Sequence, residues 1–512
     1  MMEIQQKTRG GLPAFTYNPP IETVAFGWGV NEDGQLGLLE NGNIHTPKVI
    51  EGLLGTKFRG RTFAHSPIVA GSRNTMAVTA DGQVYSWGWN DRATLGQGHQ
   101  DHVSKPRKVM GLQGVQIVQV ALGGWHALAV DSHGQCWAWG GNEYNQCDAG
   151  PGLRDILEPQ KCITNLKVTQ VDAGGMHSVA LTDTGHIWMW GEPWGDFSMT
   201  VNREPRRLDI SSKTKDTIVV KVACGAFHNL ALTANGNVYS WGINDYGQLG
   251  NGTTSNSTAP LLIEEGLYPD VKVSDIAAGG WHSLAITEHG EVHVWGRGEY
   301  GRLGLGEKNG ASRLRPTKVE GMEGHRVVEA SCGGTHTLVV TDEGRMFVWG
   351  RGSFGRLGTG TEKDFFSPVE VLLPGGPERW WVIAADAGGR HSMCLAVPDN
   401  SDLGDDQSTL ESRGTSVSSM SRNMSVPVPE PTSPTQGSSV KPKAEIPKNV
   451  WMSRENSIID DEDADDEDEH EEEGEEDGSP SSFSDGVDTS VPSYIEMISK
   501  QLVLEEDDQL PE

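Results

Sequence analysis

The sequence predicts an all-β fold, namely a seven-bladed β-propeller that is closed by its own two ends and followed by a long acidic tail. Three observations predict it. The dipeptide Trp-Gly occurs seven times at intervals of 51 to 59 residues, at Trp28, Trp87, Trp139, Trp190, Trp241, Trp295 and Trp349. A run related to Gly-Gly-x-His also occurs seven times, and the chain begins and ends in the middle of a repeat. Periods of this length are typical of propellers and solenoids.

Each repeat divides into four short strands. A Gly-Gly-x-His run leads into an alternating apolar strand, such as 282–286, and a turn that ends in Gly follows. The next strand ends at Trp-Gly and precedes a loop of the form Asn-x-x-Gly-Gln-Leu-Gly, as in 31–37. A Pro-led strand such as 316–319 and a last strand such as 327–333 complete the period. Short strands, Gly turns and the lack of a helical period favour propeller blades over a helical solenoid.

The two ends of the repeat region complement each other. Residues 23–29 read as a Trp-Gly strand without a preceding Gly-Gly-x-His run, and 381–397 contain such a run without a following Trp-Gly. Together they supply one whole blade, which we expect to close the ring and to remove its open sheet edges. We therefore predict a flexible arm at 1–20 and a propeller over 21–398.

The tail differs sharply in composition from the repeats. Residues 399–512 hold 31 acidic and 7 basic side chains, and so carry most of the net charge of −30. A Ser-, Pro- and acid-rich stretch cannot bury enough apolar surface to fold, so we predict disorder over 399–492. The block 460–477 has 15 acidic residues of 18, which suits basic partners such as histones or a merely solubilising role. Apolar residues at helical spacing predict a short amphipathic docking helix over 493–508.

The repeated histidines and tryptophans do not indicate an enzyme. A catalytic or metal-binding histidine is needed once or in one cluster, whereas this one recurs in six repeats, so we interpret it as scaffold. We find no nucleophile–base pair, phosphate loop or metal-ligand spacing, and expect no enzyme, cofactor, metal or small-molecule substrate. The cysteines form no disulfide pattern, and the sequence has neither a secretory signal nor the ~18 apolar residues of a membrane span. We expect an intracellular protein.

The repeat, Gly-Gly-x-His-Ser-Leu-Ala-Leu and then Val-Tyr-x-Trp-Gly-x-Asn-x-x-Gly-Gln-Leu-Gly, resembles that of the regulator of chromosome condensation family over about 22–398. The resemblance implies a seven-bladed propeller and three kinds of function: nucleotide exchange on the small GTPase Ran, UV-B reception, and adaptor binding. The photoreceptor carries a tryptophan two residues before the repeated His. Small residues and no tryptophan stand at that position here, at Ser72, Gly124, Gly175, Ala226, Gly280, Gly334 and Gly389. This departure argues against UV-B reception.

Three sets of residues are candidate binding surfaces. The residue before each repeated His is often aromatic, Met or Arg, the types that are enriched at interface cores. We predict a partner-binding face from Arg73, Trp125, Met176, Phe227, Trp281 and Arg390. The alternative is that these side chains fill the ring as packing. An irregular loop after Trp190 adds Trp194, Asp196, Phe197, Arg203, Arg206 and Arg207.

Two similar loops after the sixth and seventh Trp-Gly predict a basic sector of Arg297, Arg302, Arg351 and Arg356. Such a sector suits DNA phosphates, an acidic protein or the acidic tail, with ordinary solvated surface as the alternative.

These features favour a non-enzymatic regulatory adaptor that binds protein partners on one propeller face and uses its tail as a second contact. Histones or chromatin are candidate partners, and family resemblance together with the acidic block favours the nucleus over the cytoplasm. The main alternative function is nucleotide exchange on a Ran-like small GTPase, for which the irregular loop is the candidate element.

Overall fold

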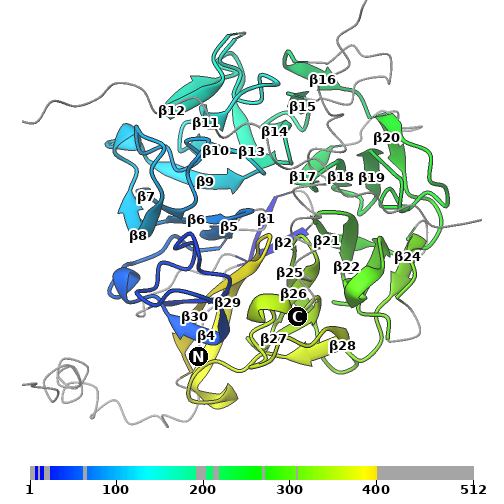
Figure 1. The fold of residues 1–512 in the computed structure, drawn as a ribbon. Coiled ribbons are helices and arrows are strands. Elements are labelled where there is room, and N and C mark those ends of the chain that lie inside the picture. Colours follow the sequence, from blue (N-terminus) through cyan, green and yellow to red (C-terminus); the bar gives the residue numbers. More distant parts are fainter. Residues whose placement is uncertain are drawn as a thin grey trace, which may run out of the picture. The chain divides into compact units, whose positions relative to one another are not determined.

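The propeller consists of seven four-stranded antiparallel sheets, the blades, arranged around a common axis (Figure 1). The computed structural model describes residues 6–9, 12–15, 23–61, 66–150, 152–191, 203–210, 218–267, 271–306 and 310–399. The seven-bladed all-β fold predicted from the repeats is confirmed. Within the predicted arm at 1–20, β1 (Gln6–Arg9) and β2 (Leu12–Phe15) pair as a two-stranded antiparallel sheet.

The first four blades follow the chain order, and in each the first strand is innermost. Blade 1 has β5 (Ile68–Ala70), β6 (Asn74–Val78), β7 (Val84–Gly88) and β8 (Val103–Lys108). Blade 2 has β9 (Ile117–Leu122), β10 (His126–Asp131), β11 (Cys136–Gly141) and β12 (Asp155–Cys162). Blade 3 has β13 (Val168–Ala173), β14 (Ser178–Thr182), β15 (Ile187–Trp190) and β16 (Arg206–Leu208). Blade 4 has β17 (Val219–Cys224), β18 (His228–Thr233), β19 (Val238–Gly242) and β20 (Ser257–Leu262).

The last three blades include the one built from both ends. Blade 5 has β21 (Val273–Ala278), β22 (His282–Thr287), β23 (Val292–Gly296) and β24 (Arg313–Lys318). Blade 6 has β25 (Val327–Cys332), β26 (His336–Thr341), β27 (Met346–Gly350) and β28 (Phe365–Glu370). Blade 7 has β29 (Trp380–Ala387), β30 (His391–Pro398), β3 (Val24–Gly29) and β4 (Ile44–Val49). Single-turn helices lie in loops at Glu51–Leu53, Met110–Leu112, Glu299–Gly301, Ser353–Gly355 and Pro377–Arg379.

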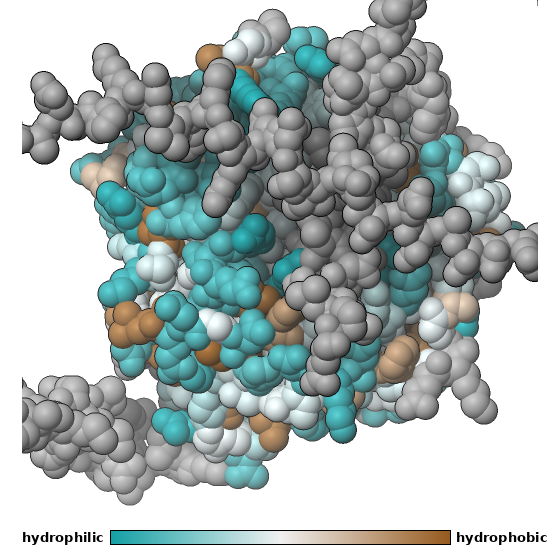
Figure 2. All heavy atoms as spheres, viewed as in Figure 1, coloured by the Kyte–Doolittle hydropathy of each residue, from teal (hydrophilic) through white to brown (hydrophobic). Residues whose placement is uncertain are grey.

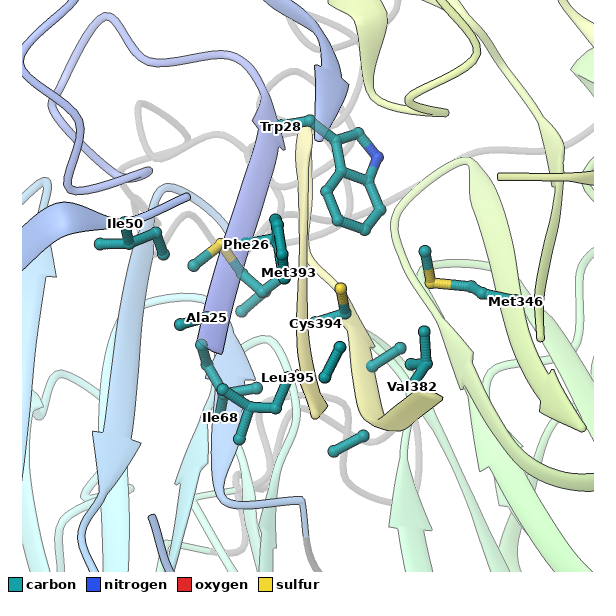
Figure 3. Packing of buried hydrophobic residues seen from close by; sticks show 14 of the residues in the cluster. Ala25, Phe26, Trp28, Ile50, Ile68, Met346, Val382, Met393, Cys394 and Leu395 are labelled. Atoms are coloured by element: carbon teal, nitrogen blue, oxygen red, sulfur yellow. The ribbon is translucent and has the colours of Figure 1, made fainter. Parts of the chain in front are cut away.

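Blade 7 closes the ring as the two incomplete repeats predicted. Strand β3 pairs antiparallel with β30, from Val24 opposite Ala396 to Gly29 opposite His391. Buried side chains from both ends of the repeat region, among them Phe26 and Met393, form one hydrophobic cluster in this blade (Figure 3). Noncovalent packing of a strand from one end therefore holds the ring shut.

The repeated His, Trp and hydroxyl side chains link each blade to the next. His126 Nε2 contacts Ser178 Oγ at 2.8 Å, and that hydroxyl donates to the carbonyl oxygen of Gln146 at 2.8 Å. Because the hydroxyl proton goes to the carbonyl, the imidazole is the donor at Nε2. Trp190 Nε1 donates to the same carbonyl at 2.8 Å. Equivalent histidine contacts join His177 to Asn229, His228 to Ser283, His282 to Thr337, His336 to Ser392 and His391 to Thr75.

These contacts confirm the interpretation of the repeated histidines as scaffold. All six are fully buried. Burial lowers the pKa of His126 to about 3 and that of His177 to about 4, so both stay neutral at physiological pH. A neutral, enclosed imidazole that donates one hydrogen bond to the next blade has a structural role.

The Gly-Gly pair that precedes five of the six repeated histidines is explained by close approach between neighbouring inner strands. A Cβ on Gly279 would lie 2.5 Å from the carbonyl oxygen of Gly333 in the next blade. The next residue, Gly280, donates its N–H to that same oxygen at 3.1 Å. The glycines therefore let backbone hydrogen bonds run from blade to blade around the axis.

Candidate functional site

One face of the propeller carries the residues before the repeated histidines and the described parts of the loops that follow Trp-Gly. In every antiparallel blade, the Gly-Gly-x-His turn and the loop after Trp-Gly lie at the same ends of the strands. We call the surface formed by these turns and loops the loop face. Sequence variation on this face sits on a constant framework, the arrangement that suits a binding surface.

The residues before the repeated histidines differ in their exposure. Arg73, Trp125 and Arg390 are half-buried. Met176, Phe227 and Trp281 are buried and belong to one hydrophobic cluster, in which the Phe227 and Trp281 ring centroids lie 4.4 Å apart. The prediction that all these residues form a partner-binding face is therefore corrected. Met176, Phe227 and Trp281 are packed inside the protein, which is the alternative considered above. The exposed aromatic surface among these residues is that of Trp125.

The predicted basic sector is largely internal, which corrects its interpretation as an exposed patch. Arg302 and Arg356 are fully buried, and Arg351 is 8% exposed. The Arg356 guanidinium donates to Thr335 Oγ1 at 2.6 Å and to the carbonyl oxygen of Gly389 at 3.4 Å. Arg302 likewise donates to the carbonyl oxygen of Gly334 at 3.3 Å.

The burial of these arginines follows from their position in the loop. Arg302 and Arg356 occupy the position of Gln in Gly-Gln-Leu-Gly, and this position faces the neighbouring blade. In the predicted basic sector, Arg297 is half-buried and pairs with Glu299.

Arginine–aromatic pairs between adjacent blades are a feature of the loop face that sequence reasoning missed. The guanidinium carbon of Arg92 lies 5.2 Å from the centroid of the Trp125 ring, and Arg297 lies 4.6 Å from that of Tyr246. The same arrangement joins Arg351 to Tyr300 at 4.4 Å and Arg390 to Phe354 at 5.4 Å. The signal was available, because Arg92, Tyr246, Tyr300 and Phe354 share one loop position, two residues before the loop Gln or its replacement. Such contacts hold large side chains rigidly at the surface.

The irregular loop lies partly outside the described residues. Trp194, Asp196 and Phe197 belong to 192–202, which the structure does not describe. Arg203 and Arg207 are exposed, and Arg206 is half-buried in β16 opposite Met189. Arg207 pairs with Asp209 at 3.1 Å.

A groove of about 220 Å³ lies where the loop of blade 2 meets the chain that enters β16. Its lining includes Glu143, Leu153, Arg154 and Arg203. The Asn145 side chain donates to the carbonyl oxygen of Arg203 at 3.1 Å and fixes one wall.

Trp125 is connected to this groove through side-chain contacts. Arg92, which stacks on Trp125, pairs with Glu143 at 3.6 Å. Glu143 also pairs with Arg154 at 2.7 Å, and Arg154 is 77% exposed. We call Arg92, Trp125, Glu143, Arg154 and Arg203 the Trp125 patch. On the face drawn in Figure 2, the described surface is mostly hydrophilic with separate apolar areas.

No grouping suited to metal chemistry or to membrane crossing is found in the part of the chain that the structure describes. Three or more His, Cys, Asp or Glu side chains do not converge there in a way that would hold a metal ion. Among the same residues, no helix has the length and apolar character to cross a bilayer. The six cysteines are buried and form no disulfide, although Cys162 Sγ lies 3.0 Å from Cys136 Sγ.

Comparison with known proteins finds a matching family model and relatives that cover most of the chain. The family model for the RCC1-like domain matches residues 24–394. The ultraviolet-B receptor UVR8 of Arabidopsis thaliana is 32% identical over 360 residues, which cover 68% of this chain and 78% of the receptor. The secretion-regulating guanine nucleotide exchange factor of Mus musculus is 29% identical over 401 residues, covering 72% of this chain and 83% of that protein.

Solved structures agree with the fold. Prp20p from Saccharomyces cerevisiae, whose crystal structure was described together with its binding to Gsp1p and histones, aligns with a TM-score of 0.64 and 23% identity. The alignment covers 76% of this chain and 94% of Prp20p. The seven repeats, the closed ring and the family match together establish that the chain belongs to the RCC1-like domain family.

Proposed function

We propose that this chain is a non-enzymatic regulatory adaptor that binds protein partners through its loop face, centred on the Trp125 patch, and that acts in the nucleus. The observation that carries the proposal is the half-buried Trp125 ring, held by Arg92 beside a groove that is lined by exposed Arg154 and Arg203. Trp and Arg are the residues that most often dominate binding energy at protein interfaces. Because its ring is held by a neighbouring arginine, Trp125 loses little conformational freedom when a partner binds.

The acidic block 460–477 is the proposed second contact. Its 15 acidic residues of 18 suit a basic partner surface, and histones have that chemistry. Prp20p, a structural relative, binds histones. The adaptor would then recognise shape through the loop face and charge through the tail.

A pull-down with the full-length chain tests both contacts. The double variant Trp125→Ala/Arg203→Ala should lose loop-face partners by at least about tenfold, as expected when anchor residues are truncated. Lys105→Ala, an exposed change on the outer strand β8, is the matched control and should lose none. Replacing the acids of 460–477 by Asn and Gln should remove only basic partners, with a loss that grows at low salt. Unchanged recovery by the loop-face variant would contradict the proposal.

Nucleotide exchange on a Ran-like small GTPase is the second candidate. The observation that favours it is the break in the repeat after Trp190, since an exchange factor among the relatives shares the rest of the architecture. Were it correct, the chain would accelerate release of a fluorescent GDP analogue from Ran by at least about tenfold, or roughly 1.4 kcal/mol in the barrier. No acceleration at micromolar concentrations of the chain would exclude it.

A further inference from the structure

A channel runs along the axis of the propeller, and its lining includes Trp125 and the Gly-Gly turns of the loop face. It is a cavity of about 300 Å³ lined by residues of the inner strands β5, β9, β13, β17, β21, β25 and β29. Small apolar side chains such as Val69, Ala121 and Ala277 form much of its wall. At the loop-face end, the blade-to-blade hydrogen bonds of the Gly-Gly pairs surround it.

Six acidic and basic side chains line this channel, and their charges do not balance. Lys221 pairs with Asp275, and Arg61 pairs with Glu329 at 3.4 Å. The remaining two are Asp172 and Asp386, for which the described residues provide no cationic partner within ion-pair distance. The channel therefore has an excess of two carboxylates when all six groups are ionised.

Neutral donors hold these two carboxylates in place. Asp386 accepts from Ser331 Oγ at 2.6 Å and from the Ala70 N–H at 2.7 Å, and so connects three consecutive blades. Asp172 accepts from the Cys224 N–H of the next blade at 2.7 Å and from the Ala173 N–H at 2.9 Å. The carboxylates are thus fixed in position while their charge stays uncompensated.

The pKa values of Asp172 and Asp386 reflect this excess of carboxylates. Burial raises the pKa of Asp386 to about 7, and the charges of Glu329 and Asp172 contribute in the same direction. Burial raises the pKa of Asp172 to about 6 against its backbone hydrogen bonds and the charge of Lys221. An empty channel therefore retains protons near neutral pH that a bound cation would displace.

A third acid in the channel has unused hydrogen-bonding capacity. The Glu329 side chain is 9% exposed, and its Oε2 has no hydrogen-bond partner among the described residues although it lies 3.4 Å from Arg61 Nε. A buried carboxylate oxygen without a donor is costly, and a ligand N–H would satisfy it. This observation is independent of the charge count and indicates a ligand that donates hydrogen bonds.

We propose that the channel binds a linear alkyl polyamine along the propeller axis. The acids stand at two levels: Asp275 and Glu329 lie four residues before the first Gly of their turns, whereas Asp172 and Asp386 lie two residues before it. Two residues of a strand span roughly 7 Å, a separation that two ammonium groups of a linear polyamine match. The alkyl segment then lies against the Ala and Val wall, and each ammonium donates to carboxylates.

Titration calorimetry of the full-length chain with spermidine tests the proposal. At pH 6.5, binding should release about one proton, because Asp386 is mostly and Asp172 partly protonated in the empty channel. Measurements in buffers of different ionisation enthalpy give the number of protons. The acidic block 460–477 also attracts spermidine, and its one histidine, His470, can release protons there because a free imidazole titrates at about pH 6.5. The measurement is therefore made on a His470→Asn background, in which the ionised carboxylates of the block release no proton, so that proton release distinguishes the channel from the tail.

Variants then assign the effect to the channel. Asp172→Asn/Asp386→Asn should abolish the proton release and weaken spermidine binding to the channel by at least about tenfold. Ala277→Leu should do the same by filling the channel, and it remains informative should the double variant fail to fold. The control Asp183→Asn removes an exposed acid near Lys167 and should behave as the unchanged chain. Spermidine binding without proton release, or release that survives Ala277→Leu, would overturn the proposal.

Discussion

Acidification from pH 7.5 to pH 5 is expected to unfold the propeller, with the largest loss of stability below about pH 6. The six repeated histidines are buried and donate through Nε2 to the next blade. Burial lowers the pKa of His126, His228 and His391 to about 3, that of His177 to about 4, and those of His282 and His336 well below the usual value. In the unfolded chain each titrates near 6.5.

The sign follows from proton uptake. A group with a depressed folded pKa binds more protons when unfolded, so stability is lost as the pH falls through 6.5 and below. Each histidine contributes about 1.4 kcal/mol per pH unit in that range. Asp172 and Asp386 act in the opposite direction, as do Asp148, Asp245 and Glu329, because their raised pKa values favour the folded state at lower pH. The pKa of His293 is also lowered by burial, so the histidines outweigh these acids and the net loss is large compared with a typical total stability of about 5–15 kcal/mol.

Denaturant unfolding followed by tryptophan fluorescence at several pH values measures this dependence. His126→Asn copies the Asn that stands at this position in blade 1, Asn74. It should lower stability at pH 7.5 but reduce the slope below pH 6 by about 1.4 kcal/mol per pH unit, the contribution of one linked histidine. His133→Asn, in an exposed turn, is the control and should leave the slope unchanged. A stability that is flat between pH 7 and 5 would contradict the prediction.

The fold was predictable because closely similar local sequence patterns recur from repeat to repeat. Trp-Gly, the hairpin Gly and the Gly-Gly-x-His run each have a positional reason that spacing alone reveals. The incomplete repeats at 23–29 and 381–397 even predicted the pairing of β3 with β30. Repetition made scaffold residues recognisable as scaffold, which is why the histidines were interpreted correctly.

The binding surfaces were harder to predict because exposure depends on the neighbouring blade. Arg302 and Arg356 look like surface residues in the sequence, yet their loop position faces the adjacent blade and buries them. Trp281 is covered for the same reason. Asp172 and Asp386 escaped notice because an isolated acid in a short strand resembles an ordinary solvent-facing residue. The axial channel exists only once seven inner strands surround it.

Trp28→Ala is expected to destabilise the propeller by about 3–5 kcal/mol, the usual range for removing a buried Trp. Trp28 is fully buried, and its Nε1 donates to the carbonyl oxygen of Arg356 in blade 6 at 2.9 Å. It stands on β3 beside Phe26, within the cluster that joins the two ends of the repeat region (Figure 3). The change therefore weakens the one blade that no continuous chain holds together.

Comparison with Trp241→Ala separates closure from simple cavity formation. Trp241 is equally buried but lies in blade 4, whose four strands follow one another in the chain, and its Nε1 contacts Met189 Sδ at 3.3 Å. Both variants should lose similar stability, but only Trp28→Ala should speed hydrogen exchange in β3 and β30 far beyond the rest of the ring. Trp28→Phe keeps most of the packing, loses the hydrogen bond and should cost about 1 kcal/mol for that bond besides a small cavity. Equal exchange in blade 7 of both alanine variants would mean that β3 is held by its backbone pairing and not by the tryptophan.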